Sequence, residues 1–336
     1  MFGGKGKLSD LKEFTRHPVE RIHVRQLSSA NDYLTAYSRL SFQARKLGHA
    51  LNVLERMAKD EGCLRVLTLA GALVPAGMGG VICDLMETGV IDCIVSTGAN
   101  VTHDLVEQAG GHHYIGSEHV DDSELQRLEI NRIYDTFLPE TEYITAQQWL
   151  DKRLGEATQQ RYTPSEMTRF LGSLDPKGHS VLATAARCQV PVFVPAFTDC
   201  ELALNIAVYN LMAKDPIVID EMGDVVRFAE LIEKRERRGS FILGGGVPRN
   251  WAQQVFPYLT HVHRHDGRRE EFLGYDYGVR IATDRPEFGG LSGCTFSESI
   301  SWGKYTAEST TASVVCDITI ALPLLVGALL ERLGRK

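Results

Sequence analysis

A lysine two residues after a tryptophan, in Trp302-Gly303-Lys304, is the clearest candidate for covalent chemistry in this chain. A lysine amine is a nucleophile only when it is neutral, and partial desolvation against an aromatic wall lowers its pKa. Trp302 offers such a wall or a cation–π face, and Glu298 can hold a cationic substrate in register. The alternative is a turn whose lysine extends along apolar surface toward water. The residues before Lys304, from 297, resemble a disordered loop.

The elements that must position this lysine alternate along the chain. Apolar residues recur at helical spacing from Ala30 to Lys59, which predicts one or two long amphipathic helices. A capping box at Thr163, followed by Pro164, predicts another helix start. The predicted strands cover residues 64–70, 91–96, 191–195, 216–220, 241–243, 279–283 and 313–316. Such alternation predicts an α/β, Rossmann-like fold, with a mainly parallel sheet and helices on both faces.

Length and composition are those of an ordinary globular protein, with 336 residues and a 43% hydrophobic share. The net charge of -7 argues against nucleic-acid binding, which needs clustered positive charge. Seven singly scattered cysteines indicate a reduced, cytosolic protein, and no apolar run is long enough to span a membrane. We expect a mobile N-terminal segment over residues 1–29 and a single domain over residues 30–336, because no linker divides the chain.

Three of the predicted strands run into glycine-rich turns, which contain Gly71, Gly98 and the run Gly244-Gly245-Gly246. Ligands of open α/β sheets bind at the carboxyl ends of the strands. Glycine lets the backbone approach a ligand closely, and amides at a following helix start can hold a pyrophosphate. No turn has the Gly-x-Gly-x-x-Gly spacing, and each alone is explained as a tight turn. Three together favour a nucleotide crevice.

Other reactive residue types give weaker patterns. His261, His263 and His265 alternate, so on a strand they would share one face and could hold a metal ion. Their charged neighbours favour a solvated strand edge or loop, so no metal is expected. No Gly-x-Ser-x-Gly elbow for a serine hydrolase occurs, and no separate phosphate cradle supports Lys304 as a pyridoxal-phosphate lysine.

Several motifs in a fixed order resemble the deoxyhypusine synthase family. They are Ile-Asn-Arg-Ile at 130–133, Thr-Pro-Ser-Glu-Met at 163–167, Pro-Ala-Phe-Thr-Asp at 195–199, Gly-Gly-Gly-Val at 244–247, Ser-Trp-Gly-Lys at 301–304, and Asp317 with Leu-Pro-Leu-Leu-Val at 322–326. Their order and spacing, from about residue 64 to the C-terminus, make the resemblance specific. It implies a Rossmann-like fold, NAD as cofactor, and a homotetramer whose active sites are shared between paired subunits.

The resemblance also implies a reaction. NAD takes a hydride from a spermidine carbon, the lysine captures the resulting imine, and a butylamine group passes to an acceptor amine, where the hydride returns. In the family the acceptor is a lysine of a translation factor. Lys304 matches the catalytic lysine, and Asp199 follows a strand end where a carboxylate can bind ribose hydroxyls. The positions implied to contact the cofactor are Gly71, Ala72, Leu73, Val74, Pro75, Thr97, Gly98, Ala99, His103, Asp199, Gly245, Thr283, Asp317 and Ile318.

Departures from the family pattern fall at the substrate site. Where the resemblance implies acidic residues and a histidine that bind spermidine, this chain has Thr102, Leu204, Leu291 and Asn250. His103 replaces a carboxylate that touches the cofactor ribose. A polyamine with several ammonium groups needs several partners, so these losses should weaken or redirect spermidine binding. Residues that could compensate, for a shorter or differently charged amine, are Glu201, Asn205 and Asp284.

We therefore expect a deoxyhypusine synthase-like, NAD-dependent aminobutyl transferase that acts through a lysine imine on polyamines or related small amines. Its substrate-binding residues would be Glu298, Trp302, Thr102 and Asn250. The alternatives are an authentic deoxyhypusine synthase that modifies a translation-factor lysine, a homospermidine synthase that uses putrescine as acceptor, and a non-catalytic nucleotide-binding relative. Lys304 favours an enzyme, because a pure binder needs no amine nucleophile. The expected partners are a small amine, possibly a protein lysine, and further copies of the chain, with no nucleic acid and no membrane.

Overall fold

A computed structural model describes residues 14–268 and 273–335. Its centre is a six-stranded sheet in which all neighbouring strands are parallel. The strands are β1 (Cys63–Leu69), β2 (Cys93–Ser96), β7 (Val192–Phe193), β9 (Arg237–Leu243), β10 (Tyr275–Ile281) and β11 (Tyr305–Val314), in the spatial order β11-β10-β9-β1-β2-β7. Numbered by chain order within this sheet, they follow the doubly wound order 3-2-1-4-5-6. The predicted α/β, Rossmann-like fold is confirmed.

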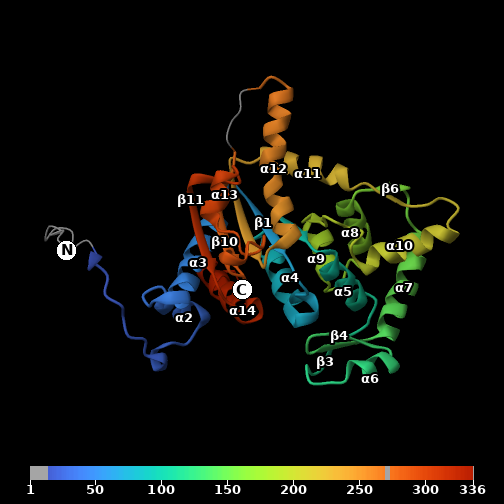
Figure 1. Cartoon of the computed structure of the whole chain (residues 1–336), viewed down its shortest axis with the longest axis horizontal. Helices are drawn as coiled ribbons and strands as arrows, with labels where there is room; N and C mark the ends of the chain where they lie inside the picture. The colour runs from blue at the N-terminus through green and yellow to red at the C-terminus, as the bar shows by residue number, and fades with distance from the viewer. Residues whose placement is uncertain (1–13, 269–272, 336) are drawn as a thin grey trace.

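Helices cover both faces of this sheet (Figure 1). One layer contains α2 (Ala30–Tyr37), α3 (Phe42–Lys59), α4 (Gly79–Glu87), α5 (Gly98–Gln108), α9 (Val181–Cys188) and α14 (Ile318–Leu333). The other contains α11 (Glu221–Glu233), α12 (Gly246–His265) and α13 (Phe296–Ser301). β1 shows why two layers form: Leu67 and Leu69 pack in the first, and Leu64 and Val66 in the second, because side chains alternate along a strand.

Smaller elements flank the β7 end of the sheet (Figure 1). They are α7 (Glu140–Leu154), α8 (Pro164–Ser173), α10 (Glu201–Met212), an antiparallel sheet of β3 (Tyr114–Ile115), β5 (Thr136–Pro139) and β4 (Ile130–Ile133) with α6 (Asp122–Arg127), and the pair β6 (Arg161–Tyr162) with β8 (Val218–Ile219). The strand predicted at 216–220 therefore exists but does not join the main sheet, because β8 pairs with β6. The remaining short helical turns are η1 (Val24–Gln26), η2 (Val74–Met78) and η3 (Pro286–Phe288).

The helices predicted over residues 30–59 are confirmed as α2 and α3, and the capping box at Thr163 starts α8 as predicted. Two local predictions were wrong. His261, His263 and His265 lie in the last turns of α12, where alternate residues point in different directions, so they do not share one face of a strand. Residues 297–303 are not a disordered loop, because most of them form α13.

Residues 1–13 of the predicted mobile segment lie outside the described residues. Residues 14–29 contact the body through Glu20, whose carboxylate lies 3.2 Å from the guanidinium of Arg39. None of the helices in residues 14–268 and 273–335 combines the length and apolar character that a membrane span requires.

Candidate active site

Lys304 lies between α13 and β11, and main-chain hydrogen bonds fix it on both sides. Its N–H donates to the carbonyl of Ser299 at 3.1 Å, and its carbonyl accepts from the N–H of Tyr275 in β10 at 3.0 Å. Thr295 begins α13 by accepting a hydrogen bond from the N–H of Glu298 at 3.0 Å. Gly303 adopts a φ of 67°, which lets the chain leave the helix and enter the strand directly. The lysine side chain therefore starts from a rigid base.

The amine of Lys304 points into the protein, and the residue is only 9% exposed. Its Nζ donates to Asn250 Oδ1 at 3.0 Å and lies 5.9 Å from the centre of the Trp302 ring. Burial lowers the pKa of Lys304, and the charge of Arg249 lowers it further, whereas Cys294 and Glu298 act in the opposite direction. The predicted juxtaposition of lysine and tryptophan is present, and the surroundings favour the neutral amine.

Asn250 connects this lysine to the centre of the sheet. It lies in the second turn of α12, which begins directly after the glycine turn that ends β9. In that turn Gly245 packs against the loop between β10 and α13, and a Cβ on Gly245 would lie 2.3 Å from the Cα of Ser292. The close packing requires glycine and holds the loop across the glycine turn.

The carboxyl ends of the strands meet at one edge because the backbone pairing continues into the turns. Ala70 N–H donates to the carbonyl of Leu243 at 3.0 Å, and Gly244 N–H to that of Ile281 at 2.8 Å. β1 and β9 lie side by side, and the chain order reverses between them, which is where open α/β sheets bind ligands. We name the predicted cofactor positions that remain open to solvent here the cofactor edge: Gly71, Ala72, Thr97, Ala99, Asp199, Thr283, Asp317 and Ile318.

The other predicted cofactor positions are buried: Leu73, Val74, Pro75, Gly98, His103 and Gly245. The N–H groups of Leu73 and Val74 both donate to Asn100 Oδ1, at 2.8 and 3.2 Å. Their amides are therefore used within the protein. Asn100, which the sequence analysis did not single out, fixes the turn after β1 to the start of α5.

The structure divides the predicted substrate positions into two groups. Glu298 and Trp302 are exposed beside Lys304, with Trp302 at 66% exposure, and Leu291 lies in the loop that covers Gly245. Thr102 and Leu204 belong to α5 and α10, on the far side of β1 from Lys304. Thr102 is buried and its hydroxyl accepts the N–H of Leu202 at 3.2 Å, so its role in this chain is to anchor the start of α10. The proposed compensating residues Glu201 and Asp284 are exposed, and Asn205 is half-buried.

Two arginines near Lys304 were not predicted. Arg249 is 1% exposed and Arg280 is 3% exposed. We name the buried group of Arg249, Arg280 and Lys304 the cation pocket. Burial lowers the pKa of Arg280, and the charge of Arg249 lowers the pKa of both Arg280 and Lys304. The sequence held one signal for it: Arg280 is a cation between Val279 and Ile281 in a buried strand.

His103 forms a chain of polar contacts behind the cofactor edge. Its Nδ1 lies 2.9 Å from His113 Nε2, and His113 Nδ1 lies 3.1 Å from a carboxylate oxygen of Glu107. Burial lowers the pKa of His103 to about 4, with a further contribution from His113. His103 is therefore a neutral imidazole near pH 7, in contrast to the carboxylate that it replaces in the family pattern.

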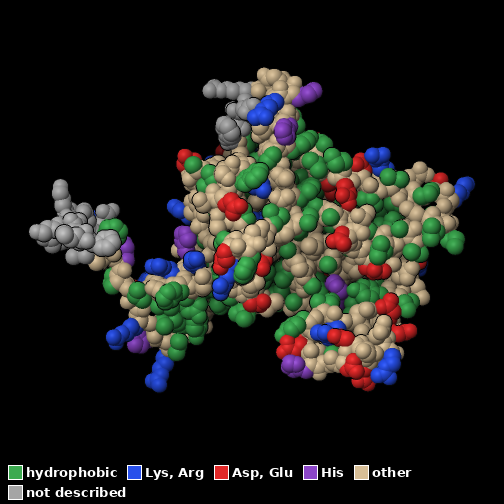
Figure 2. Space-filling view, in the orientation of Figure 1, with side chains coloured by type: hydrophobic (Ala, Val, Ile, Leu, Met, Phe, Trp, Pro, Cys, Tyr) green, Lys and Arg blue, Asp and Glu red, His purple; other side chains and the backbone are tan. Residues whose placement is uncertain are grey.

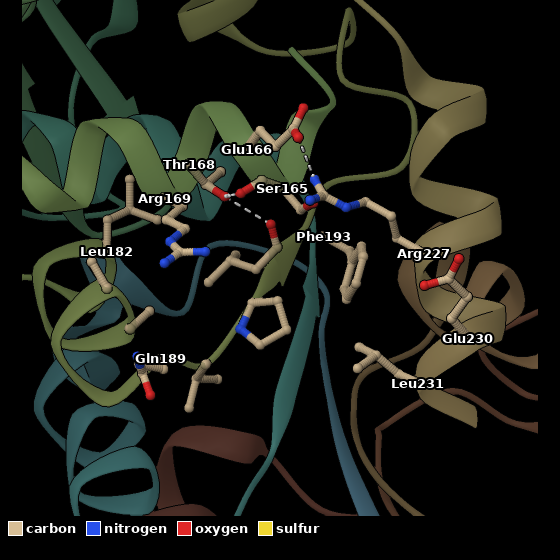
Figure 3. A pocket seen from close by; sticks show the side chains of 15 residues that line it. Ser165, Glu166, Thr168, Arg169, Leu182, Gln189, Phe193, Arg227, Glu230 and Leu231 are labelled. Carbon is tan, nitrogen blue, oxygen red and sulfur yellow. Dashed lines mark hydrogen bonds and ion pairs between the residues drawn. The ribbon is translucent and has the colours of Figure 1, made fainter. Parts of the chain in front are cut away.

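A separate cavity of about 330 Å³ lies beside the edge strand β7 (Figure 3). An ion pair of 2.8 Å between Glu166 of α8 and Arg227 of α11 closes one side. The hydroxyl of Thr168 donates to the carbonyl of Val192 at 2.8 Å. None of the predicted site residues lines this cavity, so it is distinct from the site around Lys304.

The strand order, the open turns at the switch point and a buried lysine define an α/β protein of the dinucleotide-binding type. The deoxyhypusine synthase family model matches residues 32–329, so the chain belongs to the deoxyhypusine synthase family, a family of NAD-dependent aminobutyl transferases. The fold also matches the crystal structure of an Entamoeba histolytica protein assigned as a deoxyhypusine synthase, with a TM-score of 0.64 and 18% identity over 92% of this chain and 96% of that chain.

Archaeal and bacterial relatives match over most of their length. A probable deoxyhypusine synthase of Archaeoglobus fulgidus is 38% identical over 87% of this chain and 95% of its own. One from Methanosarcina acetivorans is 35% identical over 95% of this chain and 91% of its own. A deoxyhypusine synthase-like protein of Chlorobaculum parvum is 32% identical over 94% of this chain and 89% of its own.

Proposed function

We infer that this chain transfers an aminoalkyl group, such as aminobutyl, between small amines through an imine on Lys304, with NAD as hydride carrier. The observation that carries the proposal is the state of the Lys304 amine. It is buried, it donates to an amide oxygen at 3.0 Å, and it forms no ion pair with a carboxylate of the described residues. Such an amine loses its proton more readily than an exposed lysine and can add to a carbon–nitrogen double bond.

The cofactor edge fits a dinucleotide. Gly71 has a φ of 75°, and no atom lies within 4 Å of where its Cβ would be, so a ligand can approach the backbone. Thr97 holds this turn by donating from Oγ1 to the carbonyl of Gly71 at 3.2 Å. Asp199 and Asp317 are exposed carboxylates that follow β7 and β11, the two outer strands of the sheet, and a carboxylate after a strand end can accept hydrogen bonds from ribose hydroxyls. When bound, NAD supplies the acceptor and the donor of the hydride.

Lys304 does the covalent work in this proposal. Its neutral amine adds to the imine carbon of the oxidised donor, and the original imine nitrogen leaves as a free amine together with the part of the donor attached to it, so that the aminoalkyl group stays on Nζ as an imine. Asn250 holds Nζ, and the Trp302 ring provides an apolar wall. Glu298 can pair with the ammonium end of the group. An acceptor amine then attacks the same carbon and releases Lys304.

A homotetramer with sites shared between subunits is part of the proposal. Helix α10 exposes apolar side chains at helical spacing, among them Leu204, Leu211 and Met212, and Figure 2 shows apolar side chains at this end of the molecule. A contiguous exposed apolar face on a globular protein indicates a partner. The face begins at Leu204, one of the predicted substrate positions.

Authentic deoxyhypusine synthase activity is the second candidate. The exposure of Trp302 and Glu298 favours it, because an open approach to Lys304 can admit the lysine of a protein. A homospermidine synthase would use the same chemistry with putrescine as acceptor. A non-catalytic nucleotide binder would gain nothing from the buried amine of Lys304.

Reductive trapping tests the proposal. The protein is incubated with NAD and one of spermidine, putrescine, agmatine or homospermidine, then treated with borohydride and digested for mass spectrometry. We expect a stable aminoalkyl adduct on Lys304 that depends on both NAD and amine. If no amine gives an adduct while NAD binds, the enzyme hypothesis is wrong. A parallel reaction with the translation factor as acceptor, read by transfer of labelled butylamine, distinguishes the second candidate.

A further inference from the structure

The cation pocket holds two buried guanidinium groups, those of Arg249 and Arg280, and neither forms an ion pair with a carboxylate of the described residues. Arg280 donates from Nη1 to the carbonyls of Ser292 and Cys294, at 2.6 and 3.0 Å, and from Nε to the hydroxyl of Ser313 at 3.1 Å. Arg249 donates to the carbonyl of Leu291 at 3.2 Å. All of these acceptors are neutral, so the net charge of the pocket is not compensated locally.

Both guanidinium groups keep donor capacity. The Nε of Arg249 is buried and has no hydrogen-bond partner in the part of the chain that the structure describes. The described bonds of Arg280 use Nε and Nη1, which leaves the Nη2 donors for a further acceptor. A buried polar group without a partner destabilises the folded protein, and the cost is larger when the group is charged. A ligand oxygen with negative charge would remove this cost.

Two carboxylates influence the pKa values in the pocket through their charge, without forming an ion pair with it. Asp284 acts on Arg280 and Glu298 acts on Lys304, and both acids are exposed. An ammonium group brought into this pocket would meet the like charges of Arg249 and Arg280, whereas a carboxylate would meet two opposite charges. Glu298 and Trp302 lie at the outer side of Lys304, where a cationic end can still be held.

We propose that the amine substrate of this site carries a carboxylate, as an α,ω-diamino acid does, and that Arg249 and Arg280 bind that carboxylate. The amine end lies toward Lys304 and Glu298. The inference rests on the proposed function, because it takes Lys304 as the amine nucleophile. It explains why Leu291, whose carbonyl accepts from Arg249, occupies an acidic position of the family pattern: a substrate with one ammonium end and one carboxylate needs fewer acidic partners. The carboxylate does not react, so the covalent steps at Lys304 are unchanged.

The experiment compares amines that differ only in the carboxylate. Binding of ornithine and putrescine to the full chain with NAD present is measured by calorimetry, and 5-aminovalerate is compared with pentylamine in the same way. We expect each carboxylate-bearing amine to bind at least tenfold more tightly than its partner. Putrescine that binds as tightly as ornithine, or more tightly, would overturn the proposal in the wild-type protein, without recourse to any variant.

Variants locate the effect. Arg280→Gln should reduce the ornithine preference to less than threefold, while Arg280→Lys should retain part of it. Arg285→Gln is the matched control, since Arg285 is an exposed arginine in the loop that follows β10, 3.8 Å from Glu287; it should leave the preference intact. If Arg280→Gln weakens NAD binding and preserves the preference, the anion is a phosphate of the nucleotide and the proposal is wrong. The measurement does not use turnover, so failure to trap an adduct on Lys304 would reject the proposed function alone.

Discussion

The cofactor edge and the cation pocket differ in exposure and in the groups that they present. The edge presents backbone at Gly71 and carboxylates at Asp199 and Asp317, all exposed at the ends of parallel strands. The pocket buries two guanidinium cations beside the amine of Lys304, and neutral oxygens accept their hydrogen bonds. The edge is built from main-chain geometry that any doubly wound sheet supplies, whereas the pocket depends on particular side chains.

This difference teaches how the fold can keep its cofactor chemistry while its substrate changes. Main-chain pairing between strand ends, such as Gly244 with Ile281 at 2.8 Å, sets the edge and tolerates many side chains. The selectivity of the pocket depends on charge, and a single arginine or leucine can change whether the pocket binds a positively or a negatively charged group of the substrate. Function within the family can therefore diverge at the pocket without any change at the edge.

Loss of the nucleophile should produce the largest effect and separate the two regions. We expect Lys304→Arg to reduce amine turnover by about a thousandfold or more and to abolish the trapped adduct, because a guanidinium stays protonated and forms no imine. NAD binding, measured by fluorescence titration, should change less than twofold. Lys214→Arg, at an exposed position, serves as the control. Turnover that survives in Lys304→Arg would remove the lysine from the mechanism.

Removal of a carboxylate from the cofactor edge should have the reverse pattern. Asp199→Asn should weaken NAD binding by about tenfold, because a charge-assisted hydrogen bond to a ribose hydroxyl contributes about 1.5 kcal/mol. Its ornithine-to-putrescine preference, measured at saturating NAD, should not change. Glu221→Gln would be a poor control, since Glu221 accepts the N–H of Phe197 at 2.7 Å; Asp215→Asn, near the end of α10, is a better one. Equal NAD affinity in Asp199→Asn and wild type would show that this carboxylate does not contact the cofactor.

The sequence was sufficient to place the glycine turns at the ends of the strands, but it did not predict the cation pocket. Alternation of strands and helices places Gly71, Gly98 and Gly245 at strand ends, and that placement follows from the rules of parallel sheets. The contact between Lys304 and Asn250 joins residues 54 positions apart through the packing of α12 on the sheet, and no local pattern encodes it. Arg280 illustrates the same limit, because its Nη1 donates to two main-chain carbonyl groups, which any residue type carries.

The predicted loop before Lys304 failed for a local reason. Serines and Glu298 suggested disorder, yet Thr295 caps a helix start and Phe296 packs into the core between β10 and β11, where it contacts Tyr305 with ring centroids 4.9 Å apart. A single buried aromatic residue and a cap are enough to order six residues when the next element is a strand of the sheet. Sequence spacing alone could not show that Phe296 faces the core.

Arg249 should shift the pH dependence of the lysine. Burial and the charge of Arg249 lower the pKa of Lys304, so the rate of adduct formation should rise with pH and level off below the ordinary lysine value of 10.5. Arg249→Gln should move this midpoint to higher pH and reduce the rate at pH 7.5 by about threefold to tenfold, because less of the amine is neutral. Single-turnover reactions that are quenched with borohydride at a series of pH values measure the rate of adduct formation and its midpoint. A midpoint that moves to lower pH would contradict the electrostatic role of Arg249.

His103 should give the smallest effect on catalysis and a distinct effect on stability. Burial lowers its pKa to about 4 from an unfolded value near 6.5, so the unfolded chain binds a proton between these values that the folded chain does not. The contribution of His103 to the free energy of unfolding is therefore constant above pH 6.5 and is lost as the pH falls toward 4. Relative to His103→Asn, wild type should lose about 1–2 kcal/mol of unfolding free energy between pH 7 and pH 5.

Urea denaturation of the two proteins at both pH values measures this difference, and titrations common to both cancel. The groups that face the imidazole include His113, Tyr143 and, through His113, Glu107. His113→Asn should reproduce part of the effect, because the second imidazole contributes to the low pKa of the first. If wild type and His103→Asn lose stability in parallel between pH 7 and pH 5, the fold does not lower the pKa of His103, and the imidazole gains its proton in the folded protein over this range. It then presents a cation behind the cofactor edge, and the contrast between an uncharged support there and the charged pocket at Lys304 no longer holds.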